Sequence, residues 1–182
     1  LWAQAPERDY YVLVDSIAGA QAISQGFNRC AGAPPARVLI EVGMPNRRCG
    51  VRTLPEGLAL ARAIQSLPHV ELHGVEGYEG LIGSDHAGQD AAAVLDYLCT
   101  LLDLYEALAR ERLFANPDRV LITGGGSAYY DLVAQVFAGK HKGVLPILRS
   151  GCYVTHDGGT YEQALARIAD RAITGPAPRL VP

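Results

Sequence analysis

The sequence predicts an α/β fold, namely a parallel (β/α) barrel of the TIM type that is present as an incomplete set of about five βα units. Three observations lead to this prediction. Apolar runs of strand length alternate with amphipathic helical patterns along the chain. Several of these runs are nearly continuous in Val, Leu and Ile, as in parallel strands that are buried on both faces. The 182 residues also fall short of the roughly 250 that a closed eight-unit barrel normally needs.

The expected strands are short apolar segments that are followed by polar residues, glycines or aromatic residues. They lie at Tyr10–Asp15, Arg37–Val42, Val70–Val75, Arg119–Thr123 and Leu145–Arg149. Because the carboxyl ends of parallel barrel strands lie at one end of the barrel, the loops that follow them are the expected place for functional residues.

Helical patterns fill the intervals between these strands. Helices are expected from Ser16 to about Arg29, from Thr53 to about Leu67, and over Asp90–Phe114, Ala128–Phe137 and Tyr161–Ala172. Asp15 and Ser16 are interpreted as the N-terminal cap of the first helix. Thr53 and Glu56 have the spacing of a capping box, with Pro55 at the second helical position.

The longest helical pattern, Asp90–Phe114, has apolar residues at a spacing of three and four. This spacing predicts a single stripe that faces the sheet. The stripe consists of Val94, Leu95, Leu98, Leu101, Leu102, Tyr105, Leu108 and Ala109.

Composition and charge exclude several classes of protein. With 49% hydrophobic and 19% charged residues, the sequence is that of a soluble globular domain. A formal net charge of −3 with scattered Lys and Arg residues provides no basic surface for nucleic acid. No apolar run approaches the roughly 20 residues of a membrane span, and the first residues lack the pattern of a signal peptide. We therefore expect a cytoplasmic protein that binds neither nucleic acid nor membrane.

The cysteines indicate no metal site and no disulfide. Cys30, Cys49, Cys99 and Cys152 are far apart in the sequence, with no C-x-x-C pair and no Cys/His cluster at metal spacing. We expect them to be buried free thiols.

A glycine-rich turn follows the fourth expected strand. The turn Gly124–Ser127 lies directly between a strand and a helix, where consecutive backbone N–H groups and a helix N-terminus can bind a phosphate dianion. A second turn, Arg149–Tyr153, follows the next strand. The glycine triplet alone is a weak motif, because tight turns need glycine in any case. Its position after a late strand favours a phosphate site.

Two other strand ends carry candidate binding residues. The second strand leads into a loop with Arg47, Arg48 and Arg52, which is either a solvated loop or a site for an anion or a phenolate oxygen. After the third strand, Tyr78 either stacks on a flat ring or caps the barrel. The residues alone leave both alternatives open.

Three motifs at the strand ends are more specific together than any one of them. They are Gly-Gly-Ser-Ala-Tyr at 125–129, Leu-Arg-Ser-Gly-Cys-Tyr-Val-Thr-His-Asp at 148–157, and Glu-Val-Gly followed by Arg-x-Gly-Val-Arg within 41–52. In order and spacing, they resemble the pyridoxal-phosphate (PLP) enzymes of the alanine-racemase fold. Within this fold, the likeness is to the D-serine dehydratase (amino acid deaminase) and D-threonine aldolase group, and it runs from about Tyr10 to Tyr161.

The resemblance implies roles for particular residues. It places Arg48 near the phenolic oxygen of the pyridoxal ring and Tyr78 on the cofactor or substrate side of the pocket. Arg149 would point toward the pyridine nitrogen, where a poor proton donor such as arginine weakens the ring as an electron sink. The phosphate would be bound by Gly125, Gly126, Ser127, Gly151 and Cys152. The resemblance identifies no catalytic residue and no metal ligand in this chain.

Two departures from the family concern the lysine and the domain content. The family binds the cofactor aldehyde through a lysine on an early strand, whereas the lysines of this chain, Lys140 and Lys142, are expected in a solvated turn at the amino end of a later strand. Residues 1–172 are interpreted as a partial PLP-binding α/β barrel. Residues 173–182 are interpreted as a tail leading toward a missing C-terminal β-domain, which in the family supplies a divalent metal site. We therefore expect the chain to be a piece of a larger enzyme.

The resemblance implies that the parent protein is a PLP-dependent lyase acting on small D-β-hydroxy amino acids, by β-elimination of water or retro-aldol cleavage. PLP is the expected cofactor, a divalent metal is expected only with ligands outside this chain, and a small D-amino acid is the expected substrate. A homodimer is an open expectation, because enzymes of this fold often dimerise. Without the aldehyde-binding lysine, the chain alone is expected to be inactive.

Three alternatives to the lyase remain open. The chain could be a non-catalytic PLP-binding protein, or part of an amino acid racemase of the same fold. It could also be an unrelated open α/β sheet that binds a nucleotide at Gly124–Ser127. The lack of a G-x-G-x-x-G or P-loop pattern at that turn counts against the nucleotide.

Overall fold

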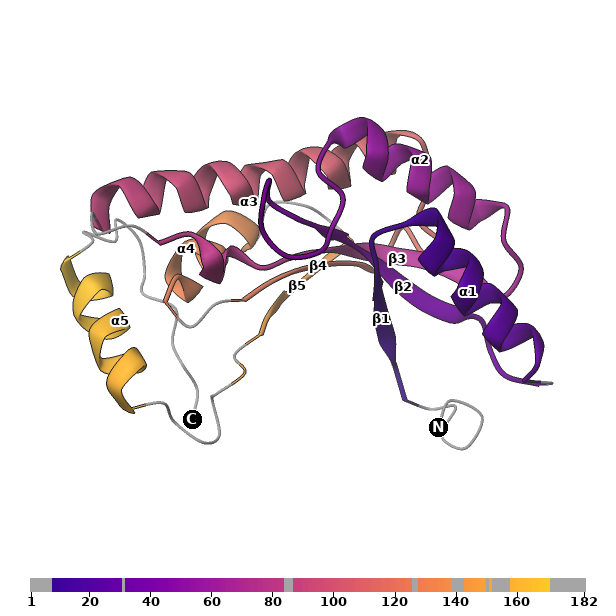
Figure 1. Cartoon of the computed structure of the whole chain (residues 1–182), viewed down its shortest axis with the longest axis horizontal. Coiled ribbons are helices and arrows are strands. Elements are labelled where there is room, and N and C mark those ends of the chain that lie inside the picture. The colour runs from indigo at the N-terminus through magenta and orange to yellow at the C-terminus, as the bar shows by residue number, and fades with distance from the viewer. Residues whose placement is uncertain are drawn as a thin grey trace.

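The computed structural model of the chain describes residues 8–30, 32–83, 87–125, 128–138, 143–149, 151 and 158–170. In chain order the elements are β1 (Tyr11–Val14), α1 (Ile17–Asn28), β2 (Ala36–Val42), α2 (Leu54–Gln65), β3 (Val70–Gly77), the 3-10 helix η1 (Glu79–Leu81), α3 (Ala87–Arg110), β4 (Val120–Gly124), α4 (Tyr130–Phe137), β5 (Val144–Leu148) and α5 (Gly158–Asp170) (Figure 1). The alternation of strands and helices that the sequence predicts is therefore confirmed.

All strands of the sheet are parallel and lie side by side in chain order. The order is β1-β2-β3-β4-β5, so each strand pairs with the one that follows it in sequence. A doubly wound sheet would reverse direction at a switch point, whereas a TIM-type barrel adds each strand next to the last. The predicted fold class, a partial parallel barrel, agrees with this topology.

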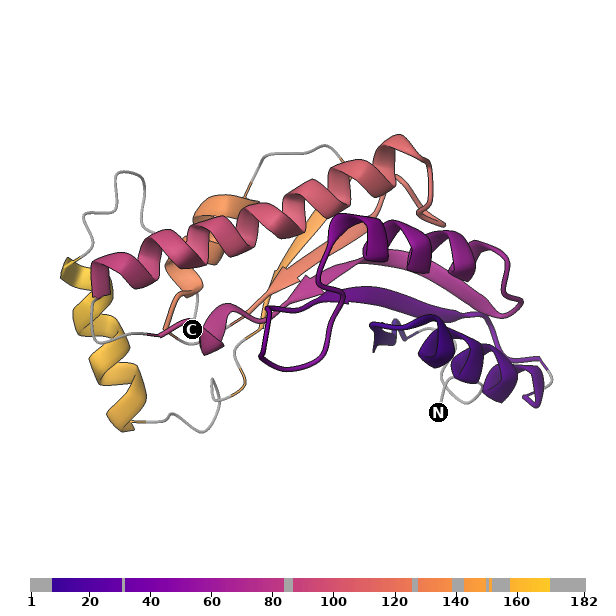
Figure 2. The ribbon, with the colours of Figure 1, turned by 45° about the horizontal axis from the view of Figure 1, so that its top comes forward.

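The helices cover the sheet and form one continuous core with it. Helices α1 to α4 follow one another around the sheet, and each packs against the next (Figures 1 and 2). Alternate residues of β2, namely Val38, Ile40 and Val42, are buried in this core. Apolar side chains on the two edge strands are exposed to solvent: Leu13 on β1 is 41% exposed and Leu145 on β5 is 39% exposed.

The helix caps follow the sequence prediction with one correction. The Thr53 side chain accepts a hydrogen bond from the Glu56 N–H, and the Glu56 carboxylate accepts one from the Thr53 N–H, as in a capping box. Ser16 caps α1 by accepting from the Gly19 N–H at 3.2 Å. Asp15 was also expected in this cap, and that was wrong. Its carboxylate accepts instead from the Gly50 N–H at 3.1 Å.

Helix α3 ends before the predicted residue Phe114. Its last residue is Arg110, and Arg112 takes a left-handed conformation with φ of 56°. The Leu113 N–H then donates to the Leu108 carbonyl and the Arg112 N–H to the Ala109 carbonyl, both at 3.0 Å. These two bonds form a Schellman motif, which turns the chain out of the helix.

The predicted apolar stripe of α3 is largely confirmed. Val94, Leu98, Leu101 and Leu108 are fully buried. Ala109 was expected in the stripe but is exposed. The buried set also includes Tyr97, Leu104 and Ala107, so the stripe is wider than the sequence spacing indicated.

The cysteine prediction was wrong about burial. Cys30, Cys49 and Cys99 are free thiols, as expected, but all three are exposed. Cys152 lies outside the described residues. Among the helices that the structure describes, none combines the length and apolar composition that a membrane span requires.

Candidate functional site

A pocket of about 400 Å³ lies at the carboxyl end of the sheet. Its lining includes Leu13 from β1, Glu41 from β2, Glu76 from β3, Gly125 after β4 and Arg149 after β5. Each strand of the sheet thus contributes to one cavity, at the end where parallel barrels carry their active sites.

The loop after β2 forms one wall of the pocket and is fixed by backbone bonds. The Gly43 N–H donates to the Val51 carbonyl at 2.9 Å, and the Val51 N–H donates to the Glu41 carbonyl at 2.8 Å. The Arg52 guanidinium braces the same loop by donating to the carbonyl oxygens of Arg48 and Cys49. Arg52 is therefore a structural residue of the loop.

The other two loop arginines line the pocket. Arg47 and Arg48 both contribute to its wall, and the Arg48 guanidinium carbon lies 5.5 Å from the centroid of the Tyr78 ring. This distance allows a cation–π contact. The contact orients both side chains at the pocket, whereas a solvated loop would leave Arg48 without a partner of this kind.

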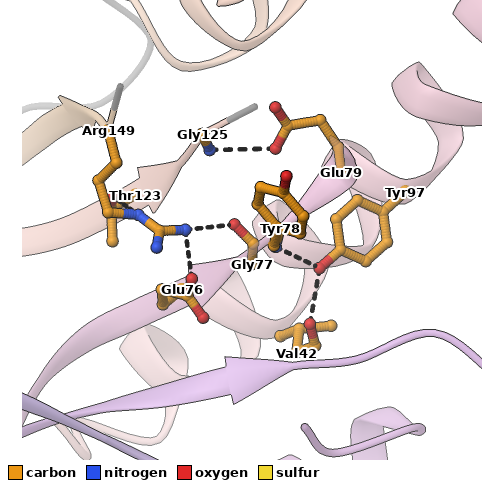
Figure 3. A network of polar contacts seen from close by, with 9 residues as sticks. All are labelled: Val42, Glu76, Gly77, Tyr78, Glu79, Tyr97, Thr123, Gly125 and Arg149. Carbon is orange, nitrogen blue, oxygen red and sulfur yellow. Dashed lines mark hydrogen bonds and ion pairs between the residues drawn. The ribbon is translucent and has the colours of Figure 1, made fainter. Parts of the chain in front are cut away.

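The backbone of Tyr78 is hydrogen-bonded to a buried tyrosine, Tyr97. The Tyr78 N–H donates to the Tyr97 hydroxyl oxygen at 3.0 Å, and that hydroxyl donates to the Val42 carbonyl at 2.6 Å (Figure 3). Burial raises the pKa of Tyr97 well above its usual range, so the hydroxyl stays protonated and can donate. A side chain at Gly77 would overlap this hydroxyl, which explains the glycine in the strand.

The Arg149 side chain extends from the end of β5 past the carboxyl ends of β4 and β3. Its Nε donates to the Thr123 hydroxyl at 3.0 Å, and its Nη2 donates to the Gly77 carbonyl at 2.7 Å (Figure 3). The same Nη2 forms an ion pair with Glu76 Oε1. The guanidinium is thus fixed at the floor of the pocket, while 39% of the side chain remains exposed.

Glu76 is a buried carboxyl group of the site. Its side chain is only 2% exposed, and its Oε2 has no hydrogen-bond partner among the described residues. Burial raises the pKa of Glu76 to about 7, and the negative charge of Glu41 adds to this effect, while the Arg149 guanidinium opposes it. The carboxyl therefore changes its charge near neutral pH.

The backbone of Gly125 approaches that of Arg149 very closely. A Cβ at Gly125 would overlap the Arg149 carbonyl oxygen, so these two turns can meet only if residue 125 is glycine. The Gly125 N–H donates to the buried Glu79 Oε2 at 3.0 Å (Figure 3). A phosphate that used this N–H would have to replace the Glu79 carboxylate.

The structure brings most of the predicted site residues together. Those that line the pocket are Arg48, Tyr78, Gly125, Arg149 and Gly151. Gly126, Ser127 and Cys152 lie outside the described residues, as do Lys140 and Lys142. Their roles toward a cofactor stay predictions.

Sequence reasoning missed the acidic part of the site. Glu76 and Glu79 flank Tyr78, and both are buried at the end of β3. The signal that could have found them is the pair of acids, Glu76 and Glu79, on either side of the carboxyl end of the third strand. Across the part of the chain that the structure describes, no three His, Cys, Asp or Glu side chains gather as metal ligands.

The parallel order of the strands and the pocket at their carboxyl ends define a partial barrel of the TIM type, with its pocket at the end where such barrels carry their active sites. Comparison with known proteins finds relatives among enzymes. The chain is 31% identical over 147 residues to D-threonine aldolase from Arthrobacter sp., an alignment that covers 81% of the chain and 36% of that enzyme. No family model matches the chain.

Solved structures agree with this likeness. D-threonine aldolase from Filomicrobium marinum superposes with a TM-score of 0.60 at 20% identity, covering 98% of the chain and 44% of that structure. D-threo-3-hydroxyaspartate dehydratase from Delftia sp. HT23 gives a TM-score of 0.54 at 26% identity, covering 76% of the chain and 34% of that structure. These enzymes of the alanine-racemase fold are homologues of the chain, so the predicted resemblance is confirmed. The chain spans less than half the length of each of them.

Proposed function

We propose that the chain is the cofactor-binding part of a PLP-dependent lyase that acts on small D-β-hydroxy amino acids. The homologues support this proposal, because an aldolase that is 31% identical to the chain and a dehydratase that is 26% identical to it are both named for such substrates. The single observation that carries it is the pocket itself, which gathers Arg48, Tyr78, Gly125, Arg149 and Gly151 from separate strand ends.

The residues of the pocket fit a flat phosphorylated ring. Its volume of about 400 Å³ lies in the range of small-molecule sites, which is about 300–1,000 Å³. Tyr78 offers an aromatic face, and the arginines outnumber the carboxylates among the described lining residues. When bound, PLP supplies the electron sink that weakens a bond at the substrate Cα.

The chain's own residues would hold and orient this group. Arg48, whose guanidinium carbon lies 5.5 Å from the centroid of the Tyr78 ring in the pocket lining, would bind an oxygen at the edge of the cofactor ring. The backbone N–H groups of Gly125 and Gly151 would bind the phosphate, and at Gly125 the phosphate would replace the Glu79 carboxylate that now accepts from this N–H. Thr123 and Glu76 hold the Arg149 guanidinium in the lining of the pocket, where it would contact the bound cofactor.

The proposed substrate and metal extend beyond this chain. We propose a small D-configured β-hydroxy amino acid as substrate, with a divalent metal supplied by residues outside the chain to activate the β-hydroxyl. Lys140 and Lys142 are the chain's lysines, and both follow α4 rather than an early strand. The aldehyde-binding lysine is therefore also proposed to lie outside these residues.

Activity on both enantiomers of the substrate tests the proposal. The full gene product that contains these residues, loaded with PLP and Mn²⁺, should release glycine from D-threonine or ammonia from D-serine, and neither product from the L-enantiomers. Absence of both activities would contradict the lyase and favour a non-catalytic PLP-binding protein. The 182-residue chain alone should turn over neither substrate. Turnover by the chain alone would show that Lys140 or Lys142 serves as the aldehyde-binding lysine.

A further inference from the structure

Arg149 connects a buried carboxylate with the open part of the pocket. Two of its nitrogens are engaged, Nε by Thr123 and Nη2 by the Gly77 carbonyl and Glu76. No residue that the structure describes accepts a hydrogen bond from its Nη1, and the side chain is 39% exposed. An anion in the pocket can therefore bind the same guanidinium that pairs with Glu76.

The surroundings of Glu76 favour its neutral form once an anion in the pocket also binds Arg149. Glu41 on β2 is its register partner, and Glu79 on η1 adds a second negative charge nearby. Tyr97 on α3 adds no charge to this group, because burial raises its pKa and its hydroxyl stays protonated and neutral. Arg149 is thus the cation that holds Glu76 ionised, and burial works against it.

The charge of the pocket matches a phosphate ester only after Glu76 is protonated. The described residues that line the pocket include three arginines and two carboxylates, so the lining carries one net positive charge when both acids are ionised. These residues are Arg47, Arg48, Arg149, Glu41 and Glu76. Neutral Glu76 raises this to two positive charges. A phosphate monoester carries about −1.5 to −2 at pH 7.

We propose that the pocket takes up its phosphate-bearing ligand together with one proton, and that Glu76 is the group that binds this proton. The inference rests on the proposed function, since that function supplies the anionic ligand. The ligand's negative charge and its claim on the Arg149 guanidinium both favour the carboxylic acid over the carboxylate. Glu76 is thereby a positioning residue. Its ionisation decides whether Arg149 pairs with Glu76 or with the ligand.

Titration calorimetry in two buffers of different ionisation enthalpy measures this proton. The probe is pyridoxine 5′-phosphate, which has the ring and phosphate of the cofactor but no aldehyde to react with lysine. At pH 7.5 the wild-type chain should take up about half a proton or more per ligand bound. Glu76→Gln should abolish the uptake, while Glu41→Gln, which removes a second lining carboxylate without touching the Arg149 pair, should keep it.

The pH dependence of the affinity provides a second measurement. Wild-type affinity should fall by up to about 10-fold per pH unit above neutral pH, whereas the affinity of Glu76→Gln should change much less. Equal proton uptake by wild type and Glu76→Gln, or ligand binding without uptake, would overturn the inference and leave the proposed function intact. Absence of any ligand binding would overturn both.

Discussion

Single residues at the strand ends determine the chemistry of the pocket. Glu76 places a carboxyl group that is 2% exposed beside the Arg149 guanidinium, in a site that was expected to bind an anion. The sequence did not predict this pair, because the third strand was expected to end at Val75. The strand in fact continues to Gly77, so Glu76 takes a position inside the sheet instead of in a solvated loop.

Replacement of Glu76 by Gln should flatten the dependence of stability on pH. Between pH 4.5 and about 7 the folded chain keeps a proton on Glu76 that the unfolded chain has released. Stability must therefore fall as pH rises through this window, by about 3 kcal/mol for a shift of this size. Urea unfolding at pH 5 and pH 8 measures the difference. Equal changes in stability between pH 5 and pH 8 for the wild-type and Glu76→Gln chains would contradict the assignment.

Replacement of Gly125 by Ala should disturb the contact between the turns after β4 and β5. The added methyl group would overlap the Arg149 backbone, and overpacking of this kind costs about 1–3 kcal/mol. Gly26→Ala is the matched control, because a Cβ there meets nothing within 4 Å. As Gly26 lies in α1, its replacement should stabilise the chain by up to about 1 kcal/mol. Equal unfolding midpoints for the two variants in urea would show that the turns are not in close contact.

The helices and strands were predictable wherever their signals are local. Continuous apolar runs located every strand of the sheet, and the capping box at Thr53 located the start of α2. The end of α3 was missed because Arg112, not glycine, occupies the left-handed position of its Schellman motif. A helix that ends at a residue other than glycine leaves no local signal in the sequence. Here the end depends on the burial of the next two residues, Leu113 and Phe114.

Replacement of Arg112 by Gly should stabilise the chain. Glycine adopts a φ of 56° without the steric cost that arginine has there, and the expected gain is about 0.5–1 kcal/mol. Arg110→Gly is the control, because it removes an arginine from the last helical residue and should destabilise by up to about 1 kcal/mol. Thermal unfolding of both variants tests the pair. Destabilisation of similar size in both would mean that α3 does not end in this motif.

The arrangement of the complete sheet accounts for the part of the site that sequence reasoning did find. Arg48, Tyr78 and Arg149 are far apart in the sequence, yet each follows a parallel strand, so the topology alone brings them to one end. The hydrogen bonds of Tyr97 and the ion pair of Glu76 depend on side-chain packing between elements, which no local pattern encodes. The chain covers 36% of its Arthrobacter relative, and the remaining steps of a lyase reaction are proposed to need residues outside it.

Equilibrium dialysis with pyridoxine 5′-phosphate tests most directly whether this pocket is a PLP site. The chain should bind one equivalent of ligand saturably, and inorganic phosphate should compete. Arg48→Ala should lower the affinity about 10-fold or more, as expected for loss of a charged hydrogen bond. Arg62→Ala, which removes an arginine on α2 that pairs with Glu111, should leave it unchanged. Absence of saturable binding, or equal affinity in the Arg48→Ala and wild-type chains, would contradict the assignment of the pocket.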